Sequence, residues 1–310
     1  MLLSIGCTGI PVEEKVSQDD AESHYLLALK YANGAGVPKD YLEAVRLLSI
    51  AAEKGHIKAQ VNLGWIYDIG LGVPENNPLA VMWFRKAAEQ GNPKAQHNIG
   101  VMLENGEGVQ HDYVKAVEWY TKSAEQGYAD AQFNLGLMYQ FGKGIEQSDT
   151  NAFKWFLASA QQDNMHAQNS LGVSYEYGRG VKKDSVKAFE WYKKAANQGL
   201  DIAQYALADF YRYGQGVDKN VQQAFKWYQE ATKNGHHNAQ HRLALMYGAG
   251  IGVPQNLTKA YVWFSVAAYR GSIKASENLQ ILLDALTKEE IAKAEDMLAE
   301  CWDTGFEGCY

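Results

Sequence analysis

The stretch that decides the fold is residues 59–73, AQVNLGWIYDIGLGV, because the chain repeats its pattern every 36 residues. Its most regular element is a Gly-x-Gly pair followed by Val or Ile. This element occurs seven times, at Gly34/Gly36, Gly70/Gly72, Gly106/Gly108, Gly142/Gly144, Gly178/Gly180, Gly214/Gly216 and Gly250/Gly252. A fixed period of this length predicts stacked copies of one small structural unit. Each copy would contact only its neighbours, which favours an extended binding surface over a closed catalytic pocket.

The second copy shows the internal order of the unit. Residues 57–68 carry apolar side chains at helical spacing, which predicts a first helix that ends at Gly70. The Gly-x-Gly turn follows, since glycine takes the positive φ that a helix C-terminus needs. A second helix then runs to Gly91, with apolar residues at positions i, i+3, i+4, i+7 and i+8 counted from Ala80.

A side chain that can cap a helix precedes the second helix in every copy. The seven residues are Asp40, Asn76, Asp112, Ser148, Asp184, Asn220 and Asn256. Their side chains accept hydrogen bonds from the first free N–H groups of a helix, so they predict where each second helix begins. Glycine ends the second helix in each copy except one, where Asp163 takes its position.

Small and aromatic residues recur at positions that predict the core. Glycines lie inside four first helices, where glycine costs about 1 kcal/mol relative to alanine. They are Gly64, Gly100, Gly136 and Gly172. Their recurrence predicts helices so close together that a methyl group would clash. The second helices carry a tryptophan column that is typical of packing between layers. Its members are Trp83, Trp119, Trp155, Trp191, Trp227 and Trp263. Replacing Trp155 or Trp191 by Ala is therefore predicted to cost about 3–5 kcal/mol.

The composition is typical of a folded protein with a large core. Hydrophobic residues make up 46% of the 310 residues, and charged residues 21%. The net charge of −7 comes with no basic stripe, which disfavours nucleic acid and anionic membranes as partners. No apolar run reaches the roughly 18 residues that a transmembrane helix needs. The repeats run without a composition break from about residue 20 to residue 271, which predicts one continuous solenoid.

The two ends of the chain depart from the repeat. The first copy has Leu47 and Leu48 in place of the aromatic pair, as expected of an end repeat with one face in solvent. Residues 272–303 are predicted to form capping helices, the last of which opens with a capping box at residues 287–290. Residues 304–310 form a tail.

Two consecutive motifs resemble a known family. The first motif is Ala-Gln-x-x-Leu-Gly-x-x-Tyr-x-x-Gly-x-Gly-Val/Ile, at residues 59–73 and 131–145. The second is Ala-x-x-Trp-Phe/Tyr-x-x-Ala-Ala-x-x-Gly, as at residues 80–91. These motifs resemble the Sel-1-like repeat, a relative of the tetratricopeptide repeat, over about four fifths of the chain. The resemblance implies an all-α solenoid, a right-handed superhelix of helix pairs, whose members serve as adaptors and scaffolds and are often bacterial. Some cysteine-rich members are described as penicillin-binding or β-lactamase-like, but the cysteine pair in each of their repeats is absent here.

Residues 1–19 lie before the repeats. Within them, Leu3-Ser4-Ile5-Gly6-Cys7 is similar to the end of a bacterial lipoprotein signal, which makes Cys7 a candidate for lipidation. Only six residues precede Cys7, so either the true start lies upstream or the similarity is a coincidence. The protein is expected in the cytoplasm as the sequence stands, and in the periplasm or cell envelope if the start lies upstream.

The other two cysteines, Cys301 and Cys309, lie eight residues apart near the C-terminus. They are candidates for a disulfide in an oxidising compartment, which would leave Cys7 unpaired. Three free thiols in the cytosol are the alternative.

No residue pattern predicts catalysis, a metal site or a cofactor. His237 and His241 are spaced like two metal ligands on one helix, but no Glu lies between them, and surface histidines are the favoured interpretation. A Gly-x-Ser-x-Gly elbow, a phosphate-binding loop and a Ser-x-x-Lys motif are absent. A cell-envelope hydrolase of β-lactamase-like or cell-wall type stays open as the alternative function, although the sequence offers no nucleophile with a neighbouring base.

The first-helix positions that vary from copy to copy predict a binding surface. By analogy with tetratricopeptide repeats, they would line a concave wall and hold a peptide or protein. The predicted peptide-binding residues are His97, Asn98, Glu104, Phe133, Asn134, Gln140, Asn169, Glu176, Tyr205, Arg212 and His241. Tyr177 and Tyr213 lie at the helix ends nearby. The favoured function is therefore a non-enzymatic interaction scaffold or adaptor with a protein or peptide partner.

Overall fold

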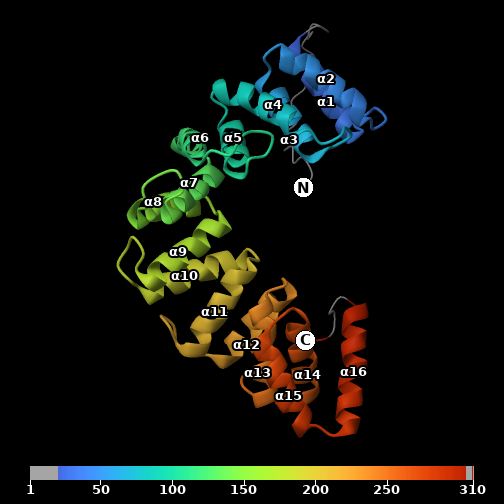
Figure 1. Ribbon diagram of the computed structural model, residues 1–310, viewed down its shortest axis with the longest axis vertical. Coiled ribbons are helices and arrows are strands. Elements are labelled where there is room, and N and C mark those ends of the chain that lie inside the picture. The colour runs from blue at the N-terminus through green and yellow to red at the C-terminus, as the bar shows by residue number, and fades with distance from the viewer. Residues whose placement is uncertain (1–19, 305–308, 310) are drawn as a thin grey trace. The chain divides into compact units, whose positions relative to one another are not determined.

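The computed structural model describes residues 20–304 and residue 309 as helices joined by short turns (Figure 1). This described part of the chain contains sixteen α-helices and no strand. The first fourteen form seven pairs, α1 (Ala21–Asn33) with α2 (Tyr41–Glu53), α3 (Ile57–Ile69) with α4 (Asn77–Glu89), α5 (Pro93–Asn105) with α6 (Tyr113–Glu125), α7 (Ala129–Phe141) with α8 (Asp149–Ala160), α9 (Met165–Tyr177) with α10 (Ser185–Asn197), α11 (Asp201–Tyr213) with α12 (Val221–Lys233), and α13 (His237–Ala249) with α14 (Leu257–Tyr269). They are followed by α15 (Ile273–Ala285) and α16 (Lys288–Asp303). Cys7, the lipidation candidate, lies outside the described residues.

The chain falls into two compact units, the first with α1–α6 and the second with α7–α16. The division lies between Gln126 and Gly127. Within each unit, every helix before α15 packs on the next one along the chain, and the two helices of a repeat share the largest contact. The all-α arrangement of stacked helix pairs predicted from the 36-residue period is confirmed.

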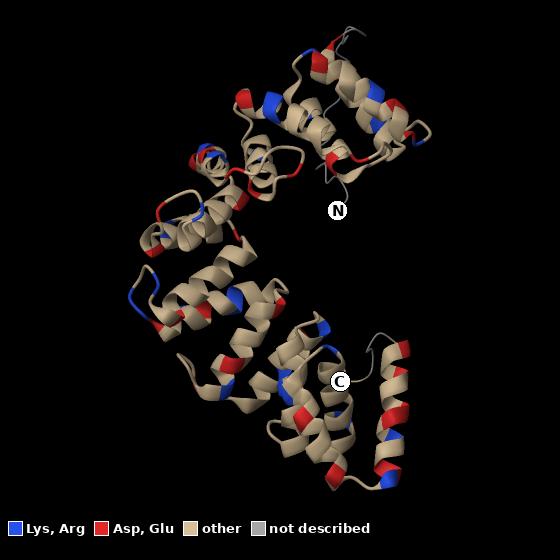
Figure 2. Ribbon diagram, viewed as in Figure 1, with Lys and Arg blue, Asp and Glu red and all other residues tan. Residues whose placement is uncertain are grey.

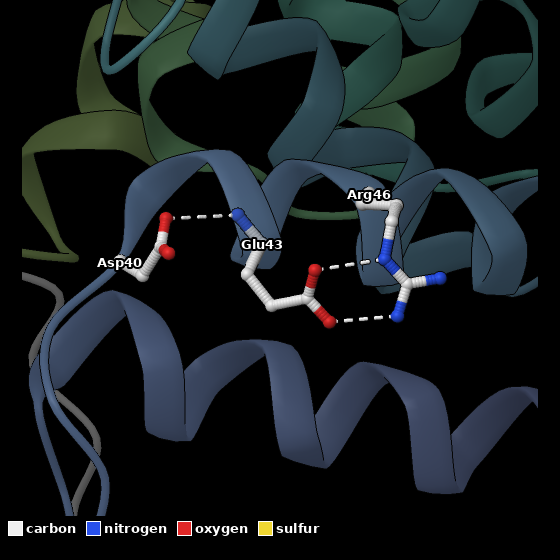
Figure 3. A network of polar contacts seen from close by, with 3 residues as sticks. All are labelled: Asp40, Glu43 and Arg46. Carbon is white, nitrogen blue, oxygen red and sulfur yellow. Dashed lines mark hydrogen bonds and ion pairs between the residues drawn. The ribbon is translucent and has the colours of Figure 1, made fainter.

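The sequence signals for helix ends act as predicted. Each first helix of a repeat ends at a glycine in the left-handed region, as at Gly70, where φ is 69° and the N–H donates to Ile66 O. The seven predicted N-caps are confirmed, because each side chain accepts from a backbone N–H in the first turn of its helix. Figure 3 shows the first of them, in which Asp40 Oδ1 accepts from Glu43 N–H at 3.0 Å. Asp163 takes a left-handed conformation, with φ of 61°, where glycine stands in the other copies.

The glycines inside the first helices lie directly under aromatic rings of the second helices. A Cβ atom added to Gly136 would lie 2.6 Å from the Phe156 ring, and one added to Gly172 would lie 2.6 Å from the Tyr192 ring. Both rings are only 2% exposed. The predicted close helix contact is confirmed, since a methyl group has no room there. The equivalent pairs in the first unit are Gly64/Phe84 and Gly100/Tyr120.

The tryptophan column is less buried than the sequence predicts. Trp83 and Trp263 are buried, at 6% and 1% exposure. The members that are partly exposed are Trp119, Trp155, Trp191 and Trp227. Adjacent residues on a helix point about 100° apart, so the aromatic residue after each tryptophan takes the interior position instead. A lysine side chain lies near the ring of Trp119, Trp155 and Trp191, as where Lys194 Nζ lies 4.1 Å from the centre of the Trp191 ring.

A buried glutamine on each first helix of repeats two to six links successive helices. Gln168 is 1% exposed, and its Nε2 donates to Ala160 O, at the end of α8, at 3.4 Å. Its Oε1 accepts from Gln198 Nε2, just after α10, at 2.8 Å. The side chain therefore satisfies a buried carbonyl group at a helix end and ties three helices together. The second contact recurs in Gln60/Gln90, Gln96/Gln126, Gln132/Gln162 and Gln204/Asn234.

The C-terminal helix packs against the last repeat. The predicted capping box at the start of α16 is confirmed, because Thr287 and Glu290 accept from each other's backbone N–H groups. α16 packs on α14. Cys301 and Cys309 form a disulfide, with Cα atoms 5.9 Å apart. Trp263 Nε1 donates to Cys309 O at 3.3 Å, so the cross-linked end of the chain lies on the core of the last repeat.

Candidate functional site

The predicted binding residues all lie on first helices, and all are partly exposed. His97, Asn98 and Glu104 belong to α5 in the first unit. The others belong to the second unit, and we call the surface that they form the first-helix face: Phe133, Asn134, Gln140, Asn169, Glu176, Tyr205, Arg212 and His241.

Side chains of successive first helices touch one another on the first-helix face. Arg242 Nε donates to Tyr205 Oη at 3.4 Å, which joins α13 to α11. Asn278 Nδ2 lies 2.9 Å from His241 Nε2, which joins α15 to α13. The face is therefore continuous over these three helices, and Arg242 belongs to it. Arg242 was missed from the sequence although it stands in the column that carries asparagine in several other copies.

Two aromatic residues among the predicted binding residues, Phe133 and Tyr205, also pack against the following helices. The Phe133 ring centre lies 5.9 Å from that of Phe156 and 5.8 Å from that of His166. Tyr205 stacks on His236 with 4.5 Å between ring centres and lies 5.7 Å from the Tyr228 ring. Both residues thus contribute intramolecular contacts, and only part of each side chain is available to a partner.

The predicted acidic residues have structural partners. Tyr120 Oη donates to Glu104 Oε2 at 2.9 Å in the first unit, and Tyr192 Oη donates to Glu176 Oε2 at 2.7 Å in the second. Burial, together with Glu176, raises the pKa of Tyr192 above its ordinary value. A buried tyrosine needs an acceptor for its hydroxyl group, and a carboxylate 16 residues earlier supplies it. That spacing was readable in the sequence.

The sixth repeat changes this arrangement. Tyr228 Oη donates to Asp209, one helical turn before the position that carries glutamate in Glu104 and Glu176. Arg212 takes the glutamate position, which reverses the charge there. Within the described part of the chain, Nη1 of Arg212 is buried and has no hydrogen-bond acceptor. The face therefore carries an arginine whose hydrogen-bonding capacity the fold does not use fully.

The first unit holds the remaining predicted residues. His97 Nδ1 lies 3.2 Å from Asn98 Oδ1, and the His97 ring centre lies 5.8 Å from that of Tyr120. These side chains contact one another or the neighbouring second helix, in the same way as their counterparts in the second unit.

The family model of the Sel1 repeat matches the chain at residues 21–56, 57–92, 93–128, 129–164, 166–200, 201–236 and 237–272. The chain belongs to the Sel1 repeat family. A protective antigen of uropathogenic Escherichia coli strains that displays an SLR fold is 31% identical, with a TM-score of 0.69, and the match covers 89% of this chain and 68% of the antigen. A Sel1 repeat protein from Oxalobacter formigenes is 37% identical, with a TM-score of 0.73 and coverage of 84% and 76%. No curated protein matches significantly.

Sel1 repeat proteins are generally protein-interaction scaffolds, and these comparisons give no support to the hydrolase alternative. Among residues 20–304 and 309, no three His, Cys, Asp or Glu side chains are grouped so that they could hold a metal ion. No helix in the same part of this Sel1 repeat chain is long and apolar enough to cross a membrane.

His236 connects the first-helix face to the start of α13. Its ring stacks on Tyr205, and its Nδ1 accepts from Ala239 N–H at 3.2 Å as the N-cap of α13. This cap requires the neutral imidazole, because a protonated Nδ1 can only donate. Burial lowers the pKa of His236 below its ordinary value, although Asp201 partly offsets the shift.

We expect the second unit of this Sel1 repeat protein to lose stability on acidification. The pKa of His236 is lower in the folded chain than its unfolded value of 6.5. Neutral His236 therefore contributes its full stabilisation above pH 6.5, and this stabilisation is lost as the pH falls through the folded pKa. His236→Asn should weaken this dependence and keep the cap, because Asn92 and Asn164 cap the equivalent helices. Melting temperatures from neutral to mildly acidic pH measure the effect. If the melting temperature drops equally in the parent chain and in His236→Asn, His236 does not contribute to the pH dependence of stability.

Proposed function

We propose that this Sel1 repeat protein is a non-enzymatic scaffold that binds a peptide or protein along its first helices. The observation that carries the proposal is the contrast between two sets of positions. The packing positions keep alanine, leucine, glycine and aromatic residues from copy to copy, whereas the partly exposed first-helix positions vary widely in size, polarity and charge. Variation at exposed positions on a rigid framework suits recognition of a partner.

Two kinds of side chain on these helices suit an extended polypeptide. Phe133, Tyr205 and Arg212 belong to the residue types that supply most binding energy in protein interfaces. Asn98, on the first unit, and Asn134, on the second, carry amide groups that can both donate to and accept from a peptide backbone. In this proposal the aromatic residues and Arg212 act as anchors, and the asparagine of each unit aligns the polypeptide bound to that unit.

The test replaces Phe133 and Tyr205 with Asn, the residue at the equivalent position 169. A partner would first be captured by cross-linking from cells of the source organism, and its affinity for both chains would then be measured. We expect the double variant to lose at least about 2 kcal/mol of binding free energy if both residues are hot spots. Because Phe133 and Tyr205 also make intramolecular contacts, the comparison should be made well below the melting temperature of the variant.

Charge reversals on second helices serve as the control. Lys122→Glu on α6 and Lys194→Glu on α10 change side chains that lie over tryptophan rings, away from the first helices. These variants should bind the partner as the parent chain does. Unchanged affinity in the Phe133/Tyr205 variant, with binding abolished by the lysine reversals, would assign the function to the second helices.

A further inference from the structure

Three strongly exposed aromatic side chains occupy the same position in three consecutive repeats of the second unit. Phe141, Tyr177 and Tyr213 are 63%, 61% and 53% exposed. Each is the last residue of its first helix, α7, α9 or α11, and stands directly before the left-handed glycine of the turn. The sequence places Tyr177 and Tyr213 near the predicted binding surface, and Phe141 is not among the residues predicted there.

The fold does not require aromatic residues at this position. The equivalent residues in other repeats include Asn33, Asn105 and Ala249, and their helices end at the same kind of left-handed glycine. Large apolar side chains in water forgo the stabilisation that burial would give them. Three consecutive rings at a position where Asn and Ala suffice therefore indicate contact with something outside the chain.

Basic side chains lie beside two of these rings. The Arg179 guanidinium lies 5.5 Å from the centre of the Tyr177 ring, and that of Arg212 lies 5.3 Å from the centre of the Tyr213 ring. Lys143 follows Phe141 by two residues, at the turn position that Arg179 occupies in the next repeat. The first three repeats have Ala35, Leu71 and Glu107 at this turn position. The turn after α9 also carries Lys182 and Lys183, and it is visible in Figure 2 as a loop coloured blue at the left of the view.

The carboxylates nearby are largely occupied, whereas the two guanidinium groups have no carboxylate partner among the described residues. Glu176 accepts from Tyr192, Asp209 accepts from Tyr228, and Asp184 caps α10. Neither Arg179 nor Arg212 forms an ion pair with any residue in the described part of the chain. Guanidinium groups pair with carboxylates through two parallel hydrogen bonds, which makes them specific receptors for Asp and Glu side chains.

We propose that Phe141, Lys143, Tyr177, Arg179, Arg212 and Tyr213 form an aromatic–basic edge that binds an acidic peptide segment with interspersed apolar side chains. The proposal rests on the proposed scaffold function and adds the chemistry of the partner. The rings bury the apolar side chains of the segment, and the guanidinium groups pair with its carboxylates. Because the whole chain carries a net charge of −7, an acidic segment is repelled elsewhere and is directed to this edge.

Selection of random short peptides displayed on phage, with the full chain as bait, tests this chemistry. Enrichment of peptides that combine Asp or Glu with Phe, Trp, Leu or Ile is expected. Affinity of the synthesised best peptide should fall as salt concentration rises, since part of the attraction is between exposed charges. Enrichment of basic or uncharged peptides, or no enrichment, would overturn the proposal. Tighter binding of single-stranded oligonucleotide than of the selected peptide would also overturn it, because rings and basic groups suit nucleic acid as well.

The decisive variants use residues that the chain itself tolerates at these positions. F141N/Y177N/Y213A reproduces Asn105, Asn33 and Ala249, and Arg179→Gln removes one charge at an exposed site. Each variant should bind the selected peptide at least about tenfold more weakly than the parent chain does, without a change in melting temperature. Ile273→Ala, at a residue that is 75% exposed on α15, is the matched control and should bind like the parent chain. Equal affinity for the parent chain and the triple variant contradicts the proposal.

The outcome separates this inference from the proposed scaffold function. If the captured partner loses affinity for the Phe133/Tyr205 variant and keeps it for the triple variant, the scaffold function stands and the edge is not its binding site. If the edge variants lower the affinity for the partner and the Phe133/Tyr205 variant does not, the aromatic–basic edge is the binding site. The remainder of the first-helix face is then not used.

Discussion

Replacing Phe156 by Ala is expected to lower the free energy of unfolding of the second unit by about 3–5 kcal/mol. The ring is 2% exposed, covers Gly136, and packs in one cluster with Leu171 and Ala167. Its removal leaves a cavity that Gly136, which has no side chain, cannot fill. Hydrogen exchange of α7–α9 measures the effect, because neighbouring repeats can open in separate steps.

Trp155→Ala is the matched control for this prediction. Trp155 precedes Phe156 and is the larger residue, but it is partly exposed, with Lys154 Nζ 5.8 Å from its ring centre. Its loss should therefore cost clearly less than the loss of Phe156, in contrast to the cost predicted from the sequence alone. A larger cost for Trp155→Ala than for Phe156→Ala would mean that the tryptophan is the interior residue after all.

The regular features of the fold could be predicted because each depends on local chemistry. A glycine before a turn, such as Gly70, and a capping side chain, such as Asp40, act within one or two helical turns, so their recurrence located the end of each first helix and the start of each second helix. The choice between Trp155 and Phe156 depends on how two helices face each other. Two adjacent aromatic residues give the same periodic pattern, and only the contact with Gly136 decides between them.

The sequence predicted which positions of the candidate site reach the surface, but it did not predict what each side chain contacts. All eleven residues are partly exposed, which agrees with the expectation that variable first-helix positions reach the surface. Glu176 was assigned to a partner, yet it accepts from Tyr192 in the neighbouring helix. Phe141 is not among the predicted binding residues. Its 63% exposure comes from the tertiary arrangement and not from the local pattern.

The disulfide near the C-terminus holds the end of the chain against the last repeat. It joins Cys301, at 1% exposure, to Cys309, at 4% exposure, across a separation of eight residues. Cys309 O accepts from Trp263 Nε1. Trp263 is the largest fully buried side chain of the described residues. Trp302 lies edge-on to Tyr269 with 5.1 Å between ring centres, so α16 adds an aromatic contact to the same repeat.

Reduction of this disulfide is expected to destabilise the second unit by about 2–3 kcal/mol, because a closed loop of this length restricts the unfolded chain by about that amount. Cys309→Ser should have the same effect and should speed hydrogen exchange at Trp263 Nε1, which donates to Cys309 O. Urea unfolding with and without a phosphine reductant measures the loss, and hydrogen exchange of α1–α6 in the first unit is the internal control. The reductant should leave the Cys309→Ser variant unchanged. If the parent chain unfolds at the same urea concentration with and without the reductant, the cross-link does not stabilise the last repeat, and the packing of α16 on α14 holds that end alone.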